Sequence, residues 1–495
     1  MQRKVPLSSL LDEVDAVIES QGEAEITGVS ADSRQVKPGY LFIAYQGFEH
    51  DGHDFIAPAV DGGAVAVVFD RPERRPVLRD VAWARVRDAR RAAAEIAAAY
   101  WEHPSREMML AGVTGTNGKT TVTYLIEAIL TAAGMRAGVI GTLGYRWGSS
   151  QIAGPRTTPD AVELQSLLRQ MVADGVQGIA MEVSSHALAL DRAWRCAFDV
   201  GVFTNLSQDH YDFHRDAEDY LAAKSRLFAD YPAQAAPHKQ MRAAVNLDDP
   251  FGRRVAELAA CEVIGFGFGA DCPVRAVDLE TSREGSSFRL VLPGGEVRID
   301  SQLPGRFNVC NSLAAAAAAH AMQIEPAAIK RGLESLASVP GRFERVDEGQ
   351  PYEIVVDYAH SEQAVENVLR LARDLQPSRL ICVFGCGGDR DPGKRPKMGC
   401  VATELADFTI ITSDNPRSED PLDIIAQIKA GVVGDAYAIE PDRREAIRMA
   451  LEMAQPGDLV LIAGKGHETE QTFADHTIEF NDREVARELL REIRR

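Results

Sequence analysis

Short runs of apolar residues recur along the chain, and in its last third each run ends abruptly in a polar loop. Four such runs have the length and β-branched content of buried strands: "EIVVDY" (353–358), "RLICVFG" (379–385), "DFTIITS" (407–413) and "DLVLIAG" (458–464). The loops after them read "AHSEQ", "CGGDRD", "DNPR" and "KGHET". Because ligands bind at the carboxyl ends of strands in an open α/β sheet, we expect these loops to meet at one crevice.

The middle of the chain alternates strand-like and helix-like segments. Apolar runs at 108–113, 137–142, 178–183 and 199–205 are separated by polar turns and helical stretches, one of them from Lys119 to about Ala133. This alternation predicts a parallel sheet with right-handed crossovers. The first part contains the strand candidates "YLFIAY" and "AVAVVFD" and a helix, "DARRAAAEIAAAYWEH", that His103 and Pro104 close.

The length of 495 residues favours about three domains of an α/β protein. One boundary is expected after His103 and Pro104, and another where Pro340 and Gly341 in "SVPGRFERV" have the character of a hinge. We therefore divide the chain into an N-terminal domain at 1–106, a central domain at 107–338 and a C-terminal domain at 339–495.

Composition and charge narrow the class of protein. With 45% hydrophobic and 26% charged residues the chain is typical of a globular protein, and its net charge of -19 argues against nucleic acid or an anionic membrane as partner. No secretory signal and no apolar run of about 18 residues is found, so we expect a cytoplasmic protein. The seven scattered cysteines indicate reduced thiols, and Cys382 and Cys386 lack a partner pair with zinc-site spacing.

"GVTGTNGKTT" (112–121) lies between a predicted strand and a predicted helix, which is the context of a phosphate-binding loop. Gly115 and Gly118 would let backbone N–H groups approach phosphate oxygens, Lys119 would reach the β- and γ-phosphates, and Thr120 would bind Mg²⁺. The spacing departs from the strict motif because Val113 stands where glycine is usual. An ordinary glycine-rich turn is the alternative; a motor or a kinase stays open, whereas a switch GTPase would need a guanine-reading N-K-x-D motif that the chain lacks.

Two further strand ends carry polar side chains that could reach this loop. "AMEVSSHAL" (180–188) supplies Glu182, and "VFTNLSQDHYDFH" (202–214) supplies His210, and both could face the Mg²⁺. A structural histidine is the alternative for His210. By its spacing alone, Lys224 in "DYLAAKSRLF" would be a surface lysine on a helix.

Taken together, the motifs resemble the Mur ligases of peptidoglycan synthesis over nearly the whole chain. They are "GTNGKTT", "EVSSHAL", "FTNLSQDHYDFH", "AAKSRLF", "GRFNVCNSLAA", "PGRFERV", "DYAH", "FGCGGDRDPGKRP", "DNPR" and "GKGHE", in the family's order. The resemblance implies an N-terminal domain for the UDP end of the substrate, a central P-loop ATPase and a C-terminal Rossmann-like domain. It also implies that ATP phosphorylates the D-glutamate carboxylate of UDP-N-acetylmuramoyl-L-Ala-D-Glu and that an incoming amine attacks the acyl phosphate.

The resemblance also assigns residues. It places ATP at Gly115, Thr116, Asn117, Gly118, Lys119, Thr120, Thr121, Asn308, Arg342 and Asp357. It assigns catalysis to Lys119, Glu182, His210 and Lys224, and Mg²⁺ to Thr120, Glu182, His210 and Lys224, the last as a carbamate formed with CO₂. It places the UDP-sugar peptide at Ser33, Phe48, Glu49, His50, Thr157, Thr158, Ser184 and Arg192. Leu190 departs from the family pattern, where some relatives carry glutamine, and "YAHSEQA" replaces the usual "YAHTPDA".

The ligases that add the third peptide residue take either L-lysine or meso-diaminopimelate, which differ by one distal carboxylate. Recognising that carboxylate requires a fixed cation, for which Arg390 and Arg417 are the candidates. The complete set expected for diaminopimelate is Arg390, Asp414, Asn415, Pro416, Arg417, Gly464 and Glu468. In the alternative, Asp414 and Arg417 pair with each other and only brace a turn.

Other functions compete with this one. A lysine-adding Mur ligase and a folylpolyglutamate synthetase-like ligase would use the same chemistry, and a nucleotide-dependent switch would use the same loop. We expect a monomer whose third domain closes on the second when ATP binds.

Overall fold

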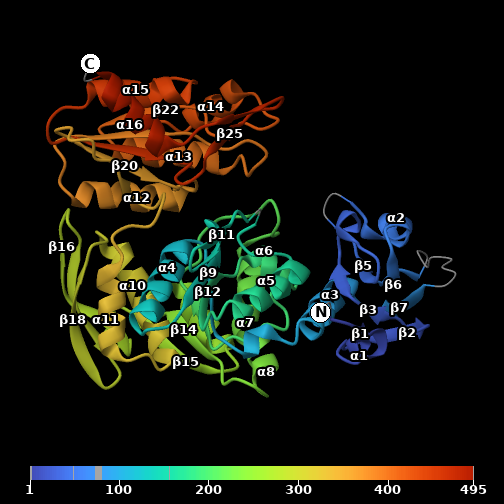
Figure 1. Cartoon of the computed structure of the whole chain (residues 1–495). Coiled ribbons are helices and arrows are strands. Elements are labelled where there is room, and N and C mark those ends of the chain that lie inside the picture. Colours follow the sequence, from blue (N-terminus) through green and yellow to red (C-terminus); the bar gives the residue numbers. More distant parts are fainter. Residues whose placement is uncertain (1–2, 48–49, 73–80, 155, 494–495) are drawn as a thin grey trace.

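The computed structural model describes residues 3–47, 50–72, 81–154 and 156–493. The chain forms three α/β bodies, whose main sheets have five, eleven and six strands. In Figure 1 the first body (blue) lies to one side, the second (cyan to yellow) in the centre, and the third (orange to red) above the second. This arrangement confirms the predicted α/β fold class with parallel sheets.

The N-terminal body has the strand order β2-β7-β6-β5-β4. The bounds are β2 (Val17–Gln21), β4 (Gly28–Ser30), β5 (Tyr40–Ala44), β6 (Ala64–Phe69) and β7 (Ala82–Val86). Helix α3 (Ala89–Tyr100) covers this sheet and also packs on the central body. Its many alanines are buried, and small side chains allow close packing on both of its sides.

The central sheet has the order β11-β10-β9-β12-β8-β13-β14-β15-β16-β17-β18, with parallel pairing from β9 to β16 and antiparallel strands at both edges. The parallel strands are β8 (Met109–Thr114), β9 (Ala137–Gly141), β12 (Gly178–Glu182), β13 (Val200–Phe203), β14 (Arg242–Asn246), β15 (Glu262–Gly267) and β16 (Val274–Thr281). The edges are β10 (Gly144–Trp147), β11 (Ser150–Ile152), β17 (Ser286–Leu292) and β18 (Gly295–Ser301).

Helices cover both faces of the central sheet. One apolar core lies under α4 (Lys119–Ala132), α10 (Arg306–Ala321) and α11 (Pro326–Ser335). A second core lies under α5 (Ala161–Ala173) and α7 (Ala217–Ala229). Parallel strands that are buried on both faces need such a covering, and their sequences are accordingly apolar throughout.

The C-terminal sheet has the order β19-β20-β24-β21-β22-β23. Its strands are β19 (Glu344–Arg345), β20 (Glu353–Asp357), β21 (Leu380–Phe384), β22 (Phe408–Ile411), β23 (Tyr437–Ile439) and β24 (Leu459–Ala463). Helices α12 (Glu362–Asp374), α13 (Lys394–Leu405) and α14 (Pro421–Lys429) cover one face, and α15 (Arg443–Met453) and α16 (Asp482–Ile493) cover the other. The four strands predicted in the last third are β20, β21, β22 and β24, and they run parallel.

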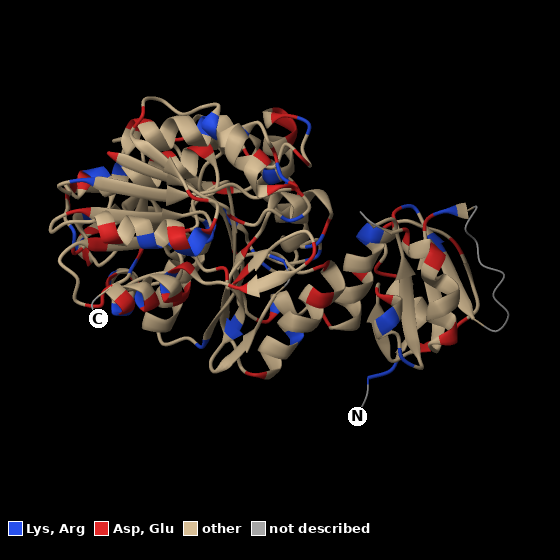
Figure 2. Cartoon of the chain, turned by 90° about the horizontal axis from the view of Figure 1, so that it is seen from above, with Lys and Arg blue, Asp and Glu red and all other residues tan. Residues whose placement is uncertain are grey.

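Several sequence-based expectations can be compared with this structure. All seven cysteines are free thiols, as expected. Basic and acidic residues are interspersed over all three bodies (Figure 2). Among the described helices, none combines the length and the apolar character needed to span a bilayer.

Candidate active site

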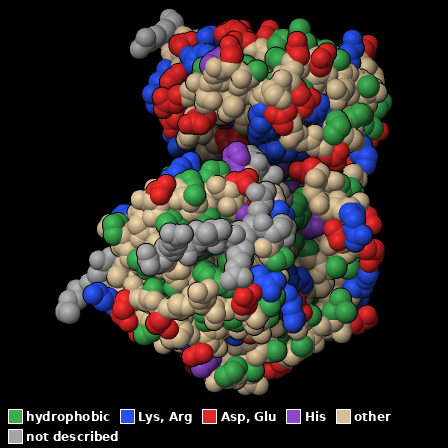
Figure 3. All heavy atoms as spheres, turned by 90° about the vertical axis from the view of Figure 1, so that its right-hand side faces the viewer, with side chains coloured by type: hydrophobic (Ala, Val, Ile, Leu, Met, Phe, Trp, Pro, Cys, Tyr) green, Lys and Arg blue, Asp and Glu red, His purple; other side chains and the backbone are tan. Residues whose placement is uncertain are grey.

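A cavity of about 650 Å³ lies between the central and C-terminal bodies. It is lined by the loop before α4, by the carboxyl ends of β9, β12 and β13, by α10, and by residues that follow β20. In the space-filling view a hollow lies below the C-terminal body, with histidine and basic side chains at its edge (Figure 3). Strand ends of two sheets, the central one and the C-terminal one, therefore line the same cavity.

The loop between β8 and α4 curls around its own lysine. Gly115 and Gly118 have φ angles of 144° and 88°, and a Cβ at Gly115 would lie 1.9 Å from Thr204 Oγ1, so this close turn requires glycine. Lys119 Nζ donates to the carbonyl oxygens of Gly115 at 3.0 Å and Thr116 at 2.8 Å. An incoming phosphate would compete with these two neutral acceptors for the cation.

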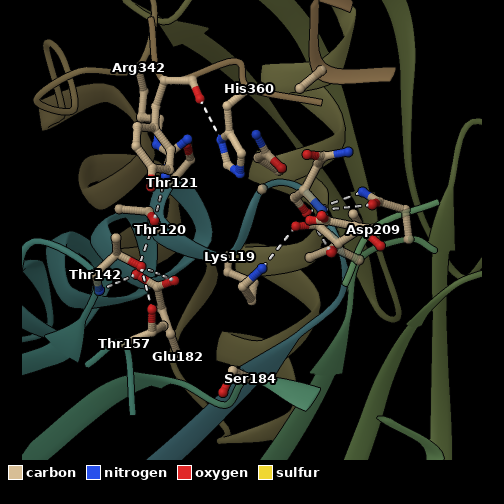
Figure 4. A pocket seen from close by; sticks show the side chains of 18 of the residues that line it. Lys119, Thr120, Thr121, Thr142, Thr157, Glu182, Ser184, Asp209, Arg342 and His360 are labelled. Carbon is tan, nitrogen blue, oxygen red and sulfur yellow. Dashed lines mark hydrogen bonds between the residues drawn. The ribbon is translucent and has the colours of Figure 1, made fainter. Parts of the chain in front are cut away.

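Glu182, at the end of β12, is the centre of a hydrogen-bond cluster drawn in Figure 4. Thr120 Oγ1 donates to its Oε1 at 2.9 Å. Thr142 donates twice, from its backbone N–H at 2.9 Å and from its hydroxyl at 3.1 Å, and the same hydroxyl lies 3.1 Å from Thr157 Oγ1. Glu182 is only 1% exposed, so this carboxylate is fixed in direction before any ligand binds.

Two lysines, the half-buried Lys119 and the buried Lys224, meet at one backbone oxygen. Lys224, on α7, donates from Nζ to Gly115 O at 2.8 Å, the oxygen that Lys119 also contacts. Burial, with the neighbouring Lys119 cation, lowers the pKa of Lys224 well below its ordinary value, and burial also lowers the pKa of Lys119. The surface position that spacing alone indicated for Lys224 is wrong, because its side chain is 1% exposed and lines the cavity.

His210 lines the same cavity in a left-handed backbone conformation, with φ of 57°. Its Nε2 lies 3.5 Å from Asp209 Oδ2, and its ring is 5.0 Å from that of His186. Burial lowers the pKa of His210, which favours the neutral imidazole that can bind a metal. Among the described residues, no group of three or more His, Cys, Asp or Glu side chains could hold a metal by itself.

The C-terminal body closes the cavity with Arg342, which is labelled opposite Lys119 in Figure 4. Its guanidinium donates to Thr120 Oγ1 at 3.2 Å and lies 4.7 Å from the ring of Tyr358. Asp357, at the end of β20, accepts from the backbone N–H groups of Phe343 and Ala359. Burial raises the pKa of Asp357.

The predicted adenine residue Asn308 is turned into the protein. Its amide donates to Pro304 O at 2.9 Å and its carbonyl accepts from Asn311 at 3.3 Å. Of these two asparagines of α10, it is Asn311, one turn further along the helix, that lines the cavity. A Cβ at Gly118 would lie 2.4 Å from its Oδ1.

The residues expected at the UDP-sugar peptide divide into two groups. Thr157, Thr158, Ser184 and Arg192 line the cavity; Thr158 Oγ1 donates to Glu182 O at 2.8 Å. Ser184 caps the short helix α6 (Ser185–Ala189), and Arg192 pairs with Asp160 at 2.9 Å. Ser33 and His50 belong to the N-terminal body and are absent from the described lining, while Phe48 and Glu49 lie outside the described residues.

The loops expected to bind the added amino acid adjoin the cavity, which Arg390 lines. Asp414 and Asn415 are buried at 7% and 6% exposure, and Asp414 Oδ1 accepts from the N–H of Asn415. Arg417, with φ of 52°, donates to Gly388 O at 2.6 Å. Arg390 likewise donates to a backbone carbonyl, that of Asp389. Within the described chain, neither Arg390 nor Arg417 forms an ion pair, so Asp414 and Arg417 do not brace the turn by pairing with each other.

Lys465 forms hydrogen bonds that hold the Asn415 loop and the loop after β24 together. It is 0% exposed, and its Nζ donates to Asn415 Oδ1 at 3.0 Å, to Glu468 Oε2 at 3.1 Å and to Glu470 O at 2.6 Å. Asn415 Nδ2 also donates to Glu468 at 2.7 Å. The expected contacts Asn415 and Glu468 are therefore parts of one network, and Gly464 begins the loop that carries it.

The sequence interpretation missed several residues of this region. Thr142, Asn311 and His360 line the cavity, and Lys465 and Arg395 hold its loops. Lys465 stands inside the motif "GKGHE", which was a usable signal, because a lysine between two glycines at a strand end is unusual for a surface turn. Thr142 carried no comparable signal, since threonine after a strand is common.

Three family models match the chain in order. The Mur ligase family catalytic domain matches residues 25–101, the Mur ligase middle domain matches 113–319, and the Mur ligase glutamate ligase domain matches 341–466.

Individual proteins match over almost the whole length. A protein of Geobacter metallireducens named UDP-N-acetylmuramoyl-L-alanyl-D-glutamate–2,6-diaminopimelate ligase is 46% identical over 486 residues, 95% of each chain. A protein of the same name from Geobacillus thermodenitrificans is 45% identical over 96% of each chain.

Solved structures match in the same way. One described by that name superposes with a TM-score of 0.68 at 32% identity, over 95% of this chain and 96% of that one. Mycobacterium tuberculosis folylpolyglutamate synthase, at 18% identity, shares the fold with a TM-score of 0.62 over 76% of this chain and 92% of its own. The chain therefore belongs to the Mur ligase family.

Proposed function

We propose that the protein joins meso-2,6-diaminopimelate to the D-glutamate of UDP-N-acetylmuramoyl-L-Ala-D-Glu, with hydrolysis of ATP to ADP and phosphate, in the cytoplasmic synthesis of peptidoglycan precursors. The observation that carries the choice of amino acid is a pair of guanidinium groups, Arg390 and Arg417, that form no ion pair with any described residue and lie on two loops, one of which also carries buried Asp414. We also propose that it acts as a monomer.

The nucleotide would lie across the two bodies. Residues 115–121 would hold its phosphates, Asn311 would lie toward the adenine with Asn308 bonded behind it, and Asp357 would reach the ribose. Arg342 already extends from the C-terminal body to the Thr120 hydroxyl, so it is in position to bind a transferring phosphoryl group. In this proposal the central domain (107–338) binds ATP and the C-terminal domain (339–495) completes the site.

The acceptor would approach from the opposite side of Glu182. Thr157, Thr158, Ser184 and Arg192 line that part of the cavity and would hold the peptide end, with its D-glutamate carboxylate near the γ-phosphate. The N-terminal domain (1–106), with Ser33 and the loop Phe48 to His50, would hold the UDP end. Alignment of the two reactants contributes a large part of such a rate enhancement.

The side chains present fit Mg²⁺. Glu182 offers a fixed carboxylate and Thr120 a hydroxyl, His210 faces the same cavity, and Mg²⁺ generally takes one or two carboxylates with phosphate oxygens and water. Lys224 fits a carbamate, because its buried amine has a lowered pKa and the neutral amine is the form that adds CO₂. When bound, Mg²⁺ would neutralise phosphate charge; the carbamate would replace a buried cation by an anion suited to a metal.

The proposed reaction has two steps, one at the ATP phosphates and one at the amine of the added amino acid. The D-glutamate carboxylate attacks the γ-phosphorus and ADP leaves, because a carboxylate and an amine do not condense unaided in water. The amine of the added amino acid then attacks the acyl carbon, and phosphate leaves as the amide forms. Lys119 and Arg342 would stabilise the charge on the transferring phosphoryl group, so the protein needs no side-chain nucleophile.

The distal end of the amino acid decides between the two substrates. Arg417 and Arg390 would bind the distal carboxylate, Asp414 and Glu468 would accept from the ammonium group, and Asn415, Pro416 and Gly464 would shape the loops. Charge-assisted hydrogen bonds contribute about 1.5–3 kcal/mol each. L-Lysine lacks this carboxylate and would leave a guanidinium without a partner, so it should be rejected strongly.

The test is phosphate release with ATP, Mg²⁺ and UDP-N-acetylmuramoyl-L-Ala-D-Glu, measured with each amino acid in turn. We expect turnover that requires the amino acid and is much faster with meso-diaminopimelate than with L-lysine. Equal rates would overturn the specificity. Turnover with a folate acceptor instead of the nucleotide-sugar peptide would favour a folylpolyglutamate synthetase-like function, and turnover independent of both substrates would favour a switch.

A further inference from the structure

Arg443 and Asp482 form a fully buried ion pair on the far side of the C-terminal sheet from α12. Each is the first residue of its helix, Arg443 of α15 and Asp482 of α16, and both side chains are 0% exposed. The contact is bidentate, with Nε–Oδ1 of 2.8 Å and Nη2–Oδ2 of 2.7 Å. Neither residue belongs to the site described above.

The remaining N–H groups of the Arg443 guanidinium bind two backbone carbonyls. Nη1 donates to Ser413 O at 3.3 Å and Nη2 donates to Ala463 O at 3.0 Å. These residues directly precede Asp414 and Gly464, where the two amino-acid loops begin. Since β22 and β24 are separated by β21, one guanidinium joins two loops that the sheet itself does not join.

The two loops are in close contact above β21. Gly385, directly after β21, leaves no room for a Cβ, which would lie 2.4 Å from Thr412 O, and a Cβ at Gly464 would lie 2.6 Å from Asp414 Oδ2. With so little free space between them, a shift of one loop would displace the other. The two bonds of Arg443 therefore set where the Asp414 carboxylate lies relative to Gly464.

The charge of Arg443 also interacts with carboxylates of the two amino-acid loops. Burial alone would lower its pKa, but Asp482 and then the nearby Asp414 and Glu468 carboxylates raise it, so the guanidinium stays charged. A buried ion pair is often replaceable by apolar side chains without loss of stability. Stability alone therefore does not explain this pair, whereas the two carbonyl contacts need N–H donors that an apolar side chain lacks.

We infer that Arg443, held by Asp482, is a positioning residue that fixes the amino-acid loops for recognition of the added amino acid. The inference rests on the proposed function of those loops. Replacing the pair by apolar side chains should impair use of the amino acid and leave the binding of ATP and of the nucleotide-sugar peptide intact.

The experiment compares Arg443→Met/Asp482→Leu with a matched control, Arg444→Met/Glu488→Leu, which removes an exposed ion pair between the same two helices. For the buried double variant we expect cooperative thermal unfolding and a KM for meso-diaminopimelate raised about tenfold or more, with the KM values for ATP and for the peptide changed less than about twofold. The control should keep all three KM values. Arg443→Lys, which keeps the charge but cannot make all four contacts, should give a smaller rise than Arg443→Met.

A folded double variant with an unchanged amino-acid KM would overturn the inference, and so would equal rises in all three KM values. If the double variant does not fold, the comparison of Arg443→Lys with the wild type decides, because lysine keeps a cation beside Asp482, and an unchanged amino-acid KM in Arg443→Lys would contradict the inference. A wild-type protein that does not use meso-diaminopimelate would instead contradict the proposed function. In that case the same KM comparison is made with the amino acid that the wild type does use.

Discussion

The position of Lys224 shows how far the sequence alone could predict the site. On spacing alone it is a lysine on a helix surface, and only the family resemblance placed it in the site. The fold buries it against Gly115 O, next to Lys119, which a sequence pattern cannot encode because the two lysines are over a hundred residues apart. The loop lysine and Glu182 were predictable because strand, turn and helix follow one another locally.

The lowered pKa of Lys224 leads to a prediction about CO₂. Because the lowered pKa favours the neutral amine, which is the form that adds CO₂, protein prepared and assayed without CO₂ and bicarbonate should lose most of its activity and recover it when bicarbonate is added. Carbon-13 NMR with labelled bicarbonate should show one carbamate signal in the wild type. A signal of equal size in Lys224→Arg, or activity that does not depend on bicarbonate, would refute the assignment.

Arg417 leads to a second prediction at this scale. Arg417→Ala removes a guanidinium that has no carboxylate partner in the described chain, so little stability should be lost. The KM for meso-diaminopimelate should rise about tenfold or more, and the KM for ATP should stay nearly constant. Steady-state kinetics with each substrate varied in turn provides the measurement. An unchanged amino-acid KM would remove Arg417 from the site.

At the scale of elements, the ends of parallel strands explain most of the site. Their apolar runs are visible in the sequence, so β8, β12, β20, β21, β22 and β24 could be predicted together with the loops that follow them. Strand β16 and the antiparallel edges β10–β11 and β17–β18 were not identified. The choice between Asn308 and Asn311 also could not be made, because both lie on α10 and only packing decides which faces the cavity.

Thr142 connects the end of β12 with the loop that contains Thr157, which leads to a prediction about its hydroxyl group. Its hydroxyl joins Glu182, at the end of β12, to Thr157, in the loop that would hold the acceptor. Thr142→Val keeps the shape and the backbone contact but removes both hydroxyl contacts. We expect kcat to fall about tenfold, whereas Thr142→Ser should stay near the wild type. Equal kcat values for the valine variant and the wild type would mean that the hydroxyl has no part in the reaction.

At the scale of the whole molecule, the proposed reaction requires three bodies to meet. Arg342 already contacts Thr120 across the central and C-terminal bodies, while closure on ATP binding stays a prediction for scattering. The contact between the first two bodies is built around Glu95 of α3, which is 2% exposed and accepts from Trp194 and Arg195 at 3.3 Å. None of these contacts could be predicted from the sequence, because they join bodies that each fold around their own core.

Glu95 makes the contact between the N-terminal and central bodies sensitive to pH. Burial, followed by its hydrogen bond with Asp15, raises the pKa of Glu95 from 4.5 to about 7. A carboxyl group whose pKa is raised on folding stabilises the protein fully below its unfolded pKa, and this stabilisation is lost as the pH rises through 7. The melting temperature of the wild type should therefore fall more between pH 5 and 8 than that of Glu95→Gln. Parallel melting curves against pH would contradict the role of Glu95.

The central claim concerns which amino acid this three-body site accepts, and a competition experiment tests it most directly. The protein is incubated with ATP, Mg²⁺, UDP-N-acetylmuramoyl-L-Ala-D-Glu and equal concentrations of meso-diaminopimelate and L-lysine, and the product masses are measured. The account predicts that the diaminopimelate product outweighs the lysine product by about a hundredfold or more, since each lost charge-assisted contact costs about tenfold or more. Equal amounts of the two products, or an excess of the lysine product, would contradict it.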